Sequence, residues 1–394
     1  MTCITRRSLI VGAGAFAGAF ALAGCQQAEP AVDTASEAES EQQTDAEQGP
    51  ESDLTPEQES ILEDGEPLDE TVLALNAMFS NGYATTDGTW DYISGGGPLI
   101  RIRPDGSDAE LLWRGHDFRV ACGLNAVDGY LYFIGCDDNE DEGETLTYDV
   151  HRIDTETLED EIIYPFPENA PSGYSPKMAV VGDRIYLSVY LEDLSDYGVI
   201  SVALDGSDER VLWTTPLSYP RFFFMPDAIY CAAGNDQDPK ILRFDLAAQA
   251  EEVLFDRSCG LEAITACAVL DGRCYATATV NGQSGTWLFE PGGSPSQLSS
   301  DSLLGATSDA LYLHSPRGEG SLDENYRFSR IDLAAGSEEA FTYPDAYSTY
   351  NSSFEFYDLG NRLLINIGEY SYSTDFEGTT LFEYNFQEAV DRVS

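Results

Sequence analysis

The densest run of potential metal ligands in this 394-residue chain begins at Asp137. Asp137, Asn139 and Asp141 stand at every second position, and oxygen side chains with this spacing can wrap one calcium ion. The run departs from the usual calcium loop because its sixth position is Glu142 rather than glycine and its twelfth is Tyr148 rather than an acid. Two interpretations stay open, a Ca²⁺ site and a solvated loop between strands. No other cofactor is expected.

The three histidines, His116, His151 and His314, are isolated from one another in the sequence. A lone histidine more often packs or lies on the surface than takes part in catalysis. The sequence also lacks a nucleophile elbow, a phosphate-binding glycine loop and an HExxH motif. These observations favour a binding protein over an enzyme and leave the question of catalysis open.

Tyrosines crowd the last part of the chain. Tyr347, Tyr350, Tyr370 and Tyr372 lie in stretches rich in Ser, Thr, Asn and Asp, which are typical of loops. Tyrosines on loops can form a stacking platform for a glycan or a peptide. On strands the same residues would fill the space between packed sheets, so both roles are considered.

The first 25 residues have the organisation of an export signal. Arg6 and Arg7 precede an uncharged stretch at 9–24, and the sequence LAGC that ends at Cys25 matches the bacterial lipobox. This segment resembles the signals of lipoproteins exported by the twin-arginine route. The resemblance implies cleavage before Cys25, acyl chains such as palmitate on that residue, and a position on the extracytoplasmic face of the cell membrane.

Residues 26–71 contain 16 acidic residues and no Lys or Arg. Such a stretch cannot bury enough apolar surface to offset its ordering entropy, so we expect a disordered acidic tether. The expected organisation is therefore a signal peptide at 1–25, a linker at 26–71 and one folded domain at 72–394.

The folded domain is strongly acidic. It holds 54 acidic and 18 basic residues, a net charge of −36, and the whole chain has only two lysines, Lys177 and Lys240. Nucleic acids and anionic lipids are poor partners for such a surface, because their binding requires cations that neutralise phosphates. A cationic ligand, a metal ion or a basic partner fits the charge better, although solubility alone also explains it. We expect contact with the membrane through the lipid anchor only.

Six cysteines remain once Cys3 and Cys25 are assigned to the signal and the lipid, and an exported protein can join them in disulfides. Cys122 and Cys136 flank one Asp-Gly turn, and Cys267 and Cys274 flank another, so we predict two local hairpin bridges. A two-residue turn would place Cys122 opposite Gly135, and the first bridge therefore needs a bulge or a longer loop.

A phrase of about fifteen residues recurs seven times along the domain. Its copies begin at Leu99, Val150, Val199, Ile241, Gly285, Phe328 and Leu381, with spacings of 51, 49, 42, 44, 43 and 53 residues and a mean of 47. Each copy reads as a hairpin, with an alternating apolar run, a turn such as Asp205-Gly206 and a returning strand that ends at Trp213. The period is near that of a four-stranded propeller blade.

A second β-rich phrase follows its own turn before each copy, as in GYLYFIG from Gly129, and an apolar segment such as Met178–Val181 precedes that turn. Each repeat thus supplies four strands, and stacking the sheets in a ring buries faces that one sheet cannot bury alone. The sequence predicts an all-β, seven-bladed β-propeller of four-stranded antiparallel blades.

At the phrases PDGSDAELL from Pro104 and LDGSDERVL from Leu204, the chain resembles TolB-like propellers and those related to the YWTD repeats of low-density-lipoprotein receptors. The likeness extends over 72–394 and implies a propeller with a binding or scaffolding role. The YWTD tetrapeptide itself is absent, and an equivalent strand reads Tyr132-Phe133-Ile134-Gly135, so no ligand-binding residue is carried over.

We therefore expect a monomeric, lipid-anchored extracytoplasmic propeller that binds an envelope or extracellular protein, a peptide or a glycan. The longest variable stretches, 137–147, 192–197, 317–325 and 370–378, are expected between second and third strands and hence on one face. The alternative is a hydrolase or lyase that acts on extracellular glycans through paired carboxylates at the central channel.

Overall fold

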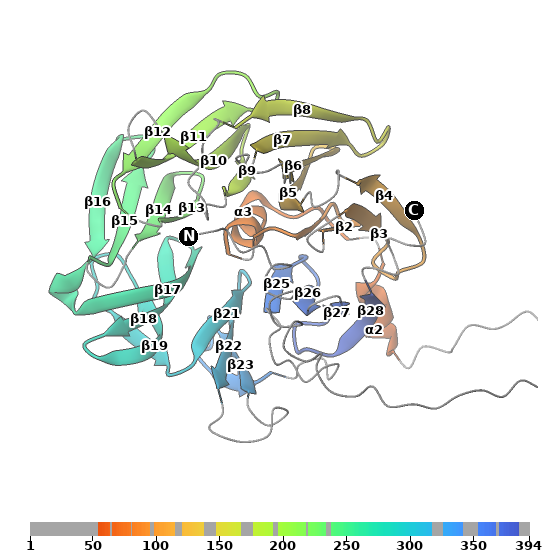
Figure 1. The fold of residues 1–394 in the computed structure, drawn as a ribbon. Helices are drawn as coiled ribbons and strands as arrows, with labels where there is room; N and C mark the ends of the chain where they lie inside the picture. Colours follow the sequence, from red (N-terminus) through yellow and green to blue (C-terminus); the bar gives the residue numbers. More distant parts are fainter. Residues whose placement is uncertain are drawn as a thin grey trace, which may run out of the picture.

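The computed structural model describes residues 54–63, 65–79, 81–94, 98–114, 120–137, 147–166, 176–191, 196–217, 220–233, 238–316, 326–341, 354–367 and 370–385. These residues form seven four-stranded antiparallel sheets arranged as a ring around one axis (Figure 1). The predicted seven-bladed β-propeller is confirmed. None of the helices in the described ranges has the length and apolar character that a membrane span requires.

Each blade consists of four consecutive strands, numbered from the axis outward. The first four blades contain β1 (Ala84–Thr86), β2 (Asp91–Ser94), β3 (Leu99–Ile102) and β4 (Ala109–Trp113); β5 (Val120–Val127), β6 (Tyr130–Asp137), β7 (Thr147–Asp154) and β8 (Asp160–Pro165); β9 (Met178–Val181), β10 (Arg184–Leu191), β11 (Asp196–Ala203) and β12 (Arg210–Thr215); and β13 (Arg221–Phe224), β14 (Ala228–Ala233), β15 (Lys240–Asp245) and β16 (Ala250–Phe255).

The other three blades contain β17 (Leu261–Leu270), β18 (Arg273–Val280), β19 (Gln283–Phe289) and β20 (Ser296–Ser299); β21 (Ser302–Ala306), β22 (Ala310–Pro316), β23 (Tyr326–Asp332) and β24 (Glu338–Ala340); and β25 (Phe354–Asp358), β26 (Leu363–Ile367), β27 (Tyr370–Thr374) and β28 (Thr380–Asn385). Two α-helices, α2 (Pro56–Ile61) and α3 (Glu70–Phe79), precede the blades, and a short 3-10 helix, η1 (Arg257–Cys259), precedes β17.

Aspartates shape the turns between third and fourth strands. The side chain of Asp154 accepts from the N–H groups of Glu156 and Thr157, and Asp245 and Asp332 make the same pair of bonds in their own blades. These backbone N–H groups hold the pKa of all three carboxyls below the ordinary value. The turns predicted from the repeated phrase thus depend on ionised aspartates.

The aromatic residue that ends the repeated phrase joins neighbouring blades. Trp213, at the end of this phrase in the third blade, stacks on Phe244 of the fourth blade with ring centroids 5.5 Å apart. Phe255 contacts Phe289 of the next blade at 5.1 Å, and Trp113 contacts Phe133 at 5.3 Å. One repeated position therefore supplies much of the packing between sheets.

The seventh copy of the phrase lies eleven residues earlier than predicted. Residues 381–385 belong to the fourth strand β28, and the third strand β27 begins at Tyr370. Asp375 accepts from the N–H groups of Glu377 and Thr379, as the equivalent aspartates do. The prediction that 370–378 form a loop between second and third strands is wrong, because the Ser-rich segment 370–374 pairs with β26.

The ordered structure begins before the predicted domain boundary. Helices α2 and α3 lie partly or wholly in 54–71, which the composition assigned to a disordered tether. Helix α3 lies at the centre of the ring (Figure 1) and contacts the inner strands β1, β5, β9, β13, β17 and β25. Seven of its ten residues are buried, since most of the sequence ETVLALNAMF is apolar.

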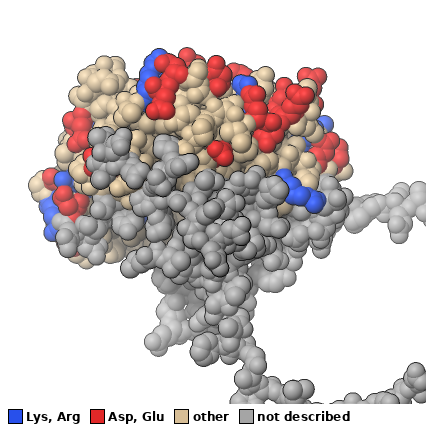
Figure 2. Space-filling model, turned by 45° about the horizontal axis from the view of Figure 1, so that its top comes forward, with Lys and Arg blue, Asp and Glu red and all other residues tan. Residues whose placement is uncertain are grey.

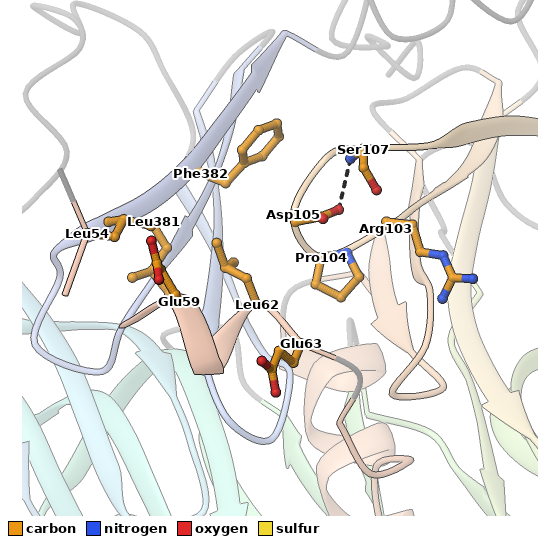
Figure 3. A pocket seen from close by; sticks show the side chains of 10 residues that line it. All are labelled: Leu54, Glu59, Leu62, Glu63, Arg103, Pro104, Asp105, Ser107, Leu381 and Phe382. Carbon is orange, nitrogen blue, oxygen red and sulfur yellow. Dashed lines mark hydrogen bonds between the residues drawn. The ribbon is translucent and has the colours of Figure 1, made fainter. Parts of the chain in front are cut away.

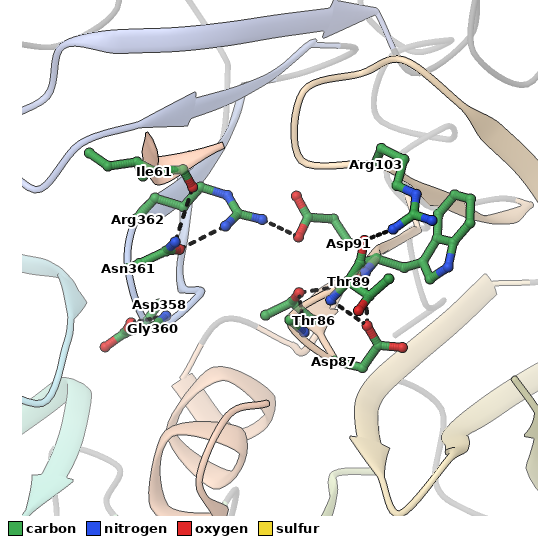
Figure 4. A network of polar contacts seen from close by, with 12 residues as sticks. Ile61, Thr86, Asp87, Thr89, Asp91, Arg103, Asp358, Gly360, Asn361 and Arg362 are labelled. Carbon is green, nitrogen blue, oxygen red and sulfur yellow. Dashed lines mark hydrogen bonds and ion pairs between the residues drawn. The ribbon is translucent and has the colours of Figure 1, made fainter. Parts of the chain in front are cut away.

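Within the described residues, the first blade and the seventh share no strand, so side chains and the chain that precedes the first blade close the ring between them. At this seam Arg362 Nη2 donates to Asp91 Oδ1 at 2.5 Å, and each side chain is only 1% exposed (Figure 4). Arg362 Nη1 donates to Asn361, while Arg362 Nε and Asp91 Oδ2 have no hydrogen-bond partner among the described residues. Burial raises the pKa of Asp91, and the guanidinium opposes that change.

Apolar contacts accompany this ion pair. A side chain on Gly106, which has φ +72°, would place Cβ 1.9 Å from the ring of Phe382, so blades one and seven meet closely there. Gly206, at the same turn of the third blade, lies against Ile163 of the second blade in the same way. The seam therefore repeats the ordinary contact between blades.

The segment 54–79, which we call the strap, crosses the seam. Asn361 Nδ2 donates to the carbonyl of Ile61 at 3.0 Å (Figure 4), and the N–H of Gly65 donates to the carbonyl of Gly88 at 2.6 Å. Between α2, the β3–β4 turn and β28 lies a groove of about 840 Å³ (Figure 3). It is lined by Leu54, Glu59, Leu62, Glu63, Arg103, Pro104, Asp105, Ser107, Leu381 and Phe382.

The buried ion pair leads to a stability prediction. Asp91→Ala should lower the free energy of unfolding by about 3–5 kcal/mol, because it leaves the Arg362 charge buried without a counterion. The double variant Asp91→Leu/Arg362→Met should recover most of that loss. Asp227→Ala, which breaks an exposed pair with Arg243, should cost less than about 1 kcal/mol. Urea unfolding measures all three, and equal losses for Asp91→Ala and Asp227→Ala would contradict the prediction.

The turn aspartates lead to a pH prediction. Their pKa values are lower in the folded chain than the ordinary 3.8, so the stability they contribute is present above that pH and is lost as the pH falls through the folded pKa values. The triple variant Asp154→Asn/Asp245→Asn/Asp332→Asn keeps an acceptor oxygen but cannot ionise. Its melting temperature should fall less than that of the wild type on acidification below pH 3.8. Equal decreases in the melting temperature of the variant and of the wild type over this pH range would contradict the prediction.

Candidate functional site

The two faces of the ring differ in what covers them. On the strap face lie α2, the segment 65–69 and the turns between first and second strands. On the opposite, distal face the inner strands begin and the second strands end, as the pairing of Arg221 with Ala232 near the end of β14 illustrates. Helix α3 enters from the strap face, where Glu70 Oε2 accepts from the N–H of Gly182 at 2.7 Å.

A group of polar side chains meets at the distal end of the axis, beyond the end of α3. We call it the axial cluster, and it comprises Asn81, Cys122, Lys177, Arg221 and Glu355. Four different blades and the chain between α3 and β1 supply these residues. The cluster exists only because the ring brings the starts of the inner strands together.

Lys177 is the centre of the axial cluster. It directly precedes β9, its backbone N–H donates to Ser188 Oγ at 2.7 Å, and its ammonium donates to Asn81 Oδ1. Burial lowers the pKa of Lys177 to about 8; the Cys122 thiol and the Glu355 carboxylate act in the opposite direction, and Arg221 adds to the lowering. This amine is therefore charged at neutral pH and loses its charge in the mildly alkaline range.

Arg221 is the first residue of β13, next to Lys177 around the ring. Its side chain remains open to solvent, yet the surrounding protein removes enough water to lower its pKa, which the Cys267 thiol opposes. No carboxylate among the described residues forms an ion pair with it. The guanidinium still carries a full charge near neutral pH.

Glu355 supplies a carboxylate to the axial cluster from β25. It is 8% exposed and accepts from the hydroxyl of Tyr357 at 3.1 Å. That hydroxyl in turn accepts from the N–H of Tyr83 at 3.3 Å, and burial raises the pKa of Tyr357 well above its ordinary value. Burial likewise raises the pKa of the Cys122 thiol to about 11, so this thiol stays protonated. The cluster thus combines two cations, one anion and neutral hydrogen-bonding groups.

The predicted calcium ligands are largely outside the described residues. Asp137 ends β6, where it pairs with Thr147, whereas Asn139 and Asp141 lie in the stretch 138–146 that the structure does not describe. Within the described ranges, no group of three or more His, Cys, Asp or Glu residues is arranged to hold a metal ion. The calcium site stays a prediction.

The predicted tyrosine platform is not brought together in the described part of the chain. Tyr347 and Tyr350 lie outside it, and Tyr370 begins β27. Tyr372 is 1% exposed and belongs to the apolar core between the sixth and seventh blades, so a role in ligand binding is wrong for this residue. The Ser-rich sequence suggested a loop, but strand pairing with Ile365 turns this side chain inward.

The predicted disulfide partners lie on diagonals of their hairpins. A bulge places Cys122 opposite Ile134 and Val120 opposite Cys136, while Cys274 pairs with Val269. Cys122, Cys267 and Cys274 are free thiols in the structure. Diagonal neighbours have Cα atoms about 7–8 Å apart, which is beyond the usual reach of a disulfide. The Cys267 and Cys274 thiols are nevertheless close enough to interact through a hydrogen bond, and both hairpin bridges stay predictions.

The described histidines have structural surroundings. His151 is buried, stacks on Phe133 with ring centroids 4.8 Å apart, and lies 3.1 Å from a carboxylate oxygen of Asp160. Burial lowers the pKa of His314, and Asp301 opposes this change. His116 lies outside the described residues. Packing, the commoner role of a lone histidine, accounts for His151.

Sequence reasoning missed the axial cluster. One signal pointed to it, because Lys177 is one of only two lysines in a chain with 70 acidic residues. The other lysine, Lys240, makes an ion pair with Asp238 at 2.7 Å. The neighbours of Lys177 come from positions 81 to 355 of the sequence and become apparent only in the closed ring.

No protein-family model matches the sequence, and a comparison with curated proteins finds no match. Among solved structures, the chain is similar to a puromycin-hydrolyzing peptidase of Mycobacterium tuberculosis, with 14% identity and a TM-score of 0.51 over 82% of this chain and 56% of that one.

The chain is also similar to a chain of a nidogen/laminin complex, with 17% identity and a TM-score of 0.40 over 63% of this chain and 90% of that one. TolB from Acinetobacter baumannii has 14% identity and a TM-score of 0.40 over 73% of this chain and 75% of its own. At these identities the similarities concern the fold alone.

Proposed function

We propose that this protein is a lipid-anchored extracytoplasmic β-propeller that binds a ligand or an envelope protein through its distal face. One observation carries the proposal: the strap occupies the other face and the centre of the ring, while Lys177 and Arg221, which form no ion pair within the described residues, lie together in the axial cluster at the distal end. Residues from the later part of the predicted linker, Leu54, Glu59, Leu62 and Glu63, line the groove on the strap face. A tether attached there leaves the distal face directed away from the membrane.

The anchor in this proposal is Cys25. Its support is the LAGC sequence after a paired-arginine, uncharged segment, and the acidic stretch that links it to the strap. The binding partner is an envelope or extracellular protein, a peptide or a glycan, and the propeller acts as a monomer. The surface visible in Figure 2, on which Asp and Glu gather with fewer Lys and Arg, disfavours nucleic acid as a partner.

Glycan cleavage would require two carboxylates placed on either side of a glycosidic bond. At the distal end of the axis, the carboxylate of Glu355 accepts a hydrogen bond from Tyr357 and lies near the ammonium of Lys177. Binding therefore agrees better with this geometry than hydrolysis or elimination does.

The binding face can be mapped by photo-crosslinking in intact cells. Benzoylphenylalanine at Tyr197 or Gln283 reports on the distal face, and the same residue at Tyr130 or Ser296 reports on the strap face. Discrete adducts should form from the distal positions and be absent or much weaker from the strap-face positions. Adducts from the strap-face positions in place of the distal ones would contradict the proposed binding surface.

The anchor is tested by Cys25→Ala. This variant should lose its acyl chains, because the residue that carries them in the proposal is absent. Arg6→Lys/Arg7→Lys should instead keep the chain inside the cell. Cell fractionation and mass spectrometry of the mature N-terminus measure both results. A mature wild-type chain without acyl groups on Cys25 would rule out the lipid anchor.

A further inference from the structure

We propose that Lys177 and Arg221 together form an oxyanion site at the distal end of the axis, which holds the carboxylate or phosphate group of a small organic ligand. This inference rests on the proposed binding function and specifies the chemistry of its ligand. It follows from which cations in the chain have ionic partners and which do not.

Acids outnumber bases 70 to 20 in this chain, so an exposed cation meets a carboxylate almost wherever it lies. Most described cations do form ion pairs with carboxylates, as shown by Arg101–Glu110, Arg152–Glu161, Arg184–Asp208, Arg210–Asp208, Lys240–Asp238, Arg243–Asp245, Arg273–Glu290, Arg330–Asp309 and Arg362–Asp91. Lys177 and Arg221 are exceptions, and both lie in the axial cluster.

Neither cation is satisfied by its protein neighbours. An ammonium has three N–H donors, and the hydrogen bond described for Lys177 Nζ is the one to Asn81. A guanidinium has five donors, and Arg221 makes no side-chain hydrogen bond within the described residues. The nearby carboxylate of Glu355 is bonded to Tyr357. Two adjacent cations with free donors match the oxygens of one carboxylate or phosphate.

The negative net charge of the whole protein restricts where an anion can bind. A net charge of −50 repels an approaching anion, and at about 0.15 M salt that repulsion decays over roughly 8 Å. Affinity must then come from direct contact with the two cations in a partly desolvated place, where charge-assisted hydrogen bonds are strongest. Anions should therefore bind at the axial cluster and hardly anywhere else on this surface.

The scarcity of lysine provides a direct test. Incorporation of lysine labelled with ¹³C at Cε labels only Lys177 and Lys240 and keeps their N–H groups, so the full-length chain in neutral detergent gives two side-chain signals in an NMR spectrum. Lys177→Gln assigns the signal, and Lys240 is the internal control. Acetate, citrate and inorganic phosphate are titrated against chloride at constant ionic strength. The Lys177 signal should shift in a saturable way with citrate or phosphate, and the Lys240 signal should not.

Arg221→Gln should weaken the apparent affinity of that titration by about tenfold or more, and Arg221→Lys should restore part of it. Raising the pH from 7 to 9 should weaken anion binding to the wild type, because Lys177 loses its charge while Arg221 keeps its own. The neighbouring Cys122 thiol, whose pKa burial raises to about 11, stays neutral in this interval and so adds no negative charge of its own. Lys177→Arg, measured by calorimetry, should bind with little dependence on pH.

Whether citrate or phosphate binds more tightly decides between a carboxylate and a phosphate ligand. A Lys177 signal that shifts no more than that of Lys240 with any anion overturns the oxyanion site. So does a saturable shift that Arg221→Gln leaves unchanged, provided the variant melts like the wild type. The crosslinking pattern at Tyr197 and Gln283 does not depend on either cation, so failure here leaves the distal binding face to be judged separately.

Discussion

The ring depends on how it closes at the seam between the first and last blades, which share no strand within the described residues. Many contacts between blades are repeated, but Asp91 and Arg362 meet only where the first and last blades come together. The Arg362 and Asp91 side chains are each 1% exposed. Separating the two charges without admitting water would cost far more free energy than leaving them in contact. At this seam the pair acts together with the apolar cluster of the first and seventh blades and with the hydrogen bond from Asn361 to the strap.

The position of the axial cluster follows from that closure. Lys177, Arg221 and Glu355 are first or early residues of inner strands, so their separation is set by the circumference of the ring. Helix α3 adds a second constraint from within, because the chain leaving it carries Asn81 to the ammonium of Lys177. The side chain of Asn76 within the helix also exchanges two hydrogen bonds with the backbone of Asp358 in the seventh blade. The strap, the seam and the site are thus parts of one packed unit.

Local patterns in the sequence predicted the blades well because a blade is built from local pairings. Met178–Val181 is a strand with the predicted bounds, and the Asp128-Gly129 turn adopts the positive φ angles that a tight hairpin requires. The method failed where composition misled, as in the Ser-rich strand 370–374 and the acidic helix α2. Helix α3 was missed because a short segment that is mostly apolar has no periodicity to distinguish it from a buried strand.

The axial cluster could not be predicted from any pattern, since its members are far apart in sequence and have no common motif. Only the rarity of lysine set Lys177 apart, and rarity does not reveal neighbours. In a propeller, residues from different blades become neighbours around the central axis. The sequence of a single repeat does not show which residues of the other blades these neighbours are.

The absence of a shared strand also determines when the molecule can mature during synthesis. A ribosome releases Asp91 early and Arg362 late, with more than two-thirds of the chain between them. Until the last blade emerges, the apolar cluster around Ile93 and Ile100 lacks Tyr357 and Leu364, its partners from that blade. An incomplete chain therefore keeps an exposed apolar surface on its first blade, which chaperones and proteases can recognise. Only a chain that has been translated as far as the last blade can bury this surface, so its burial marks a complete chain.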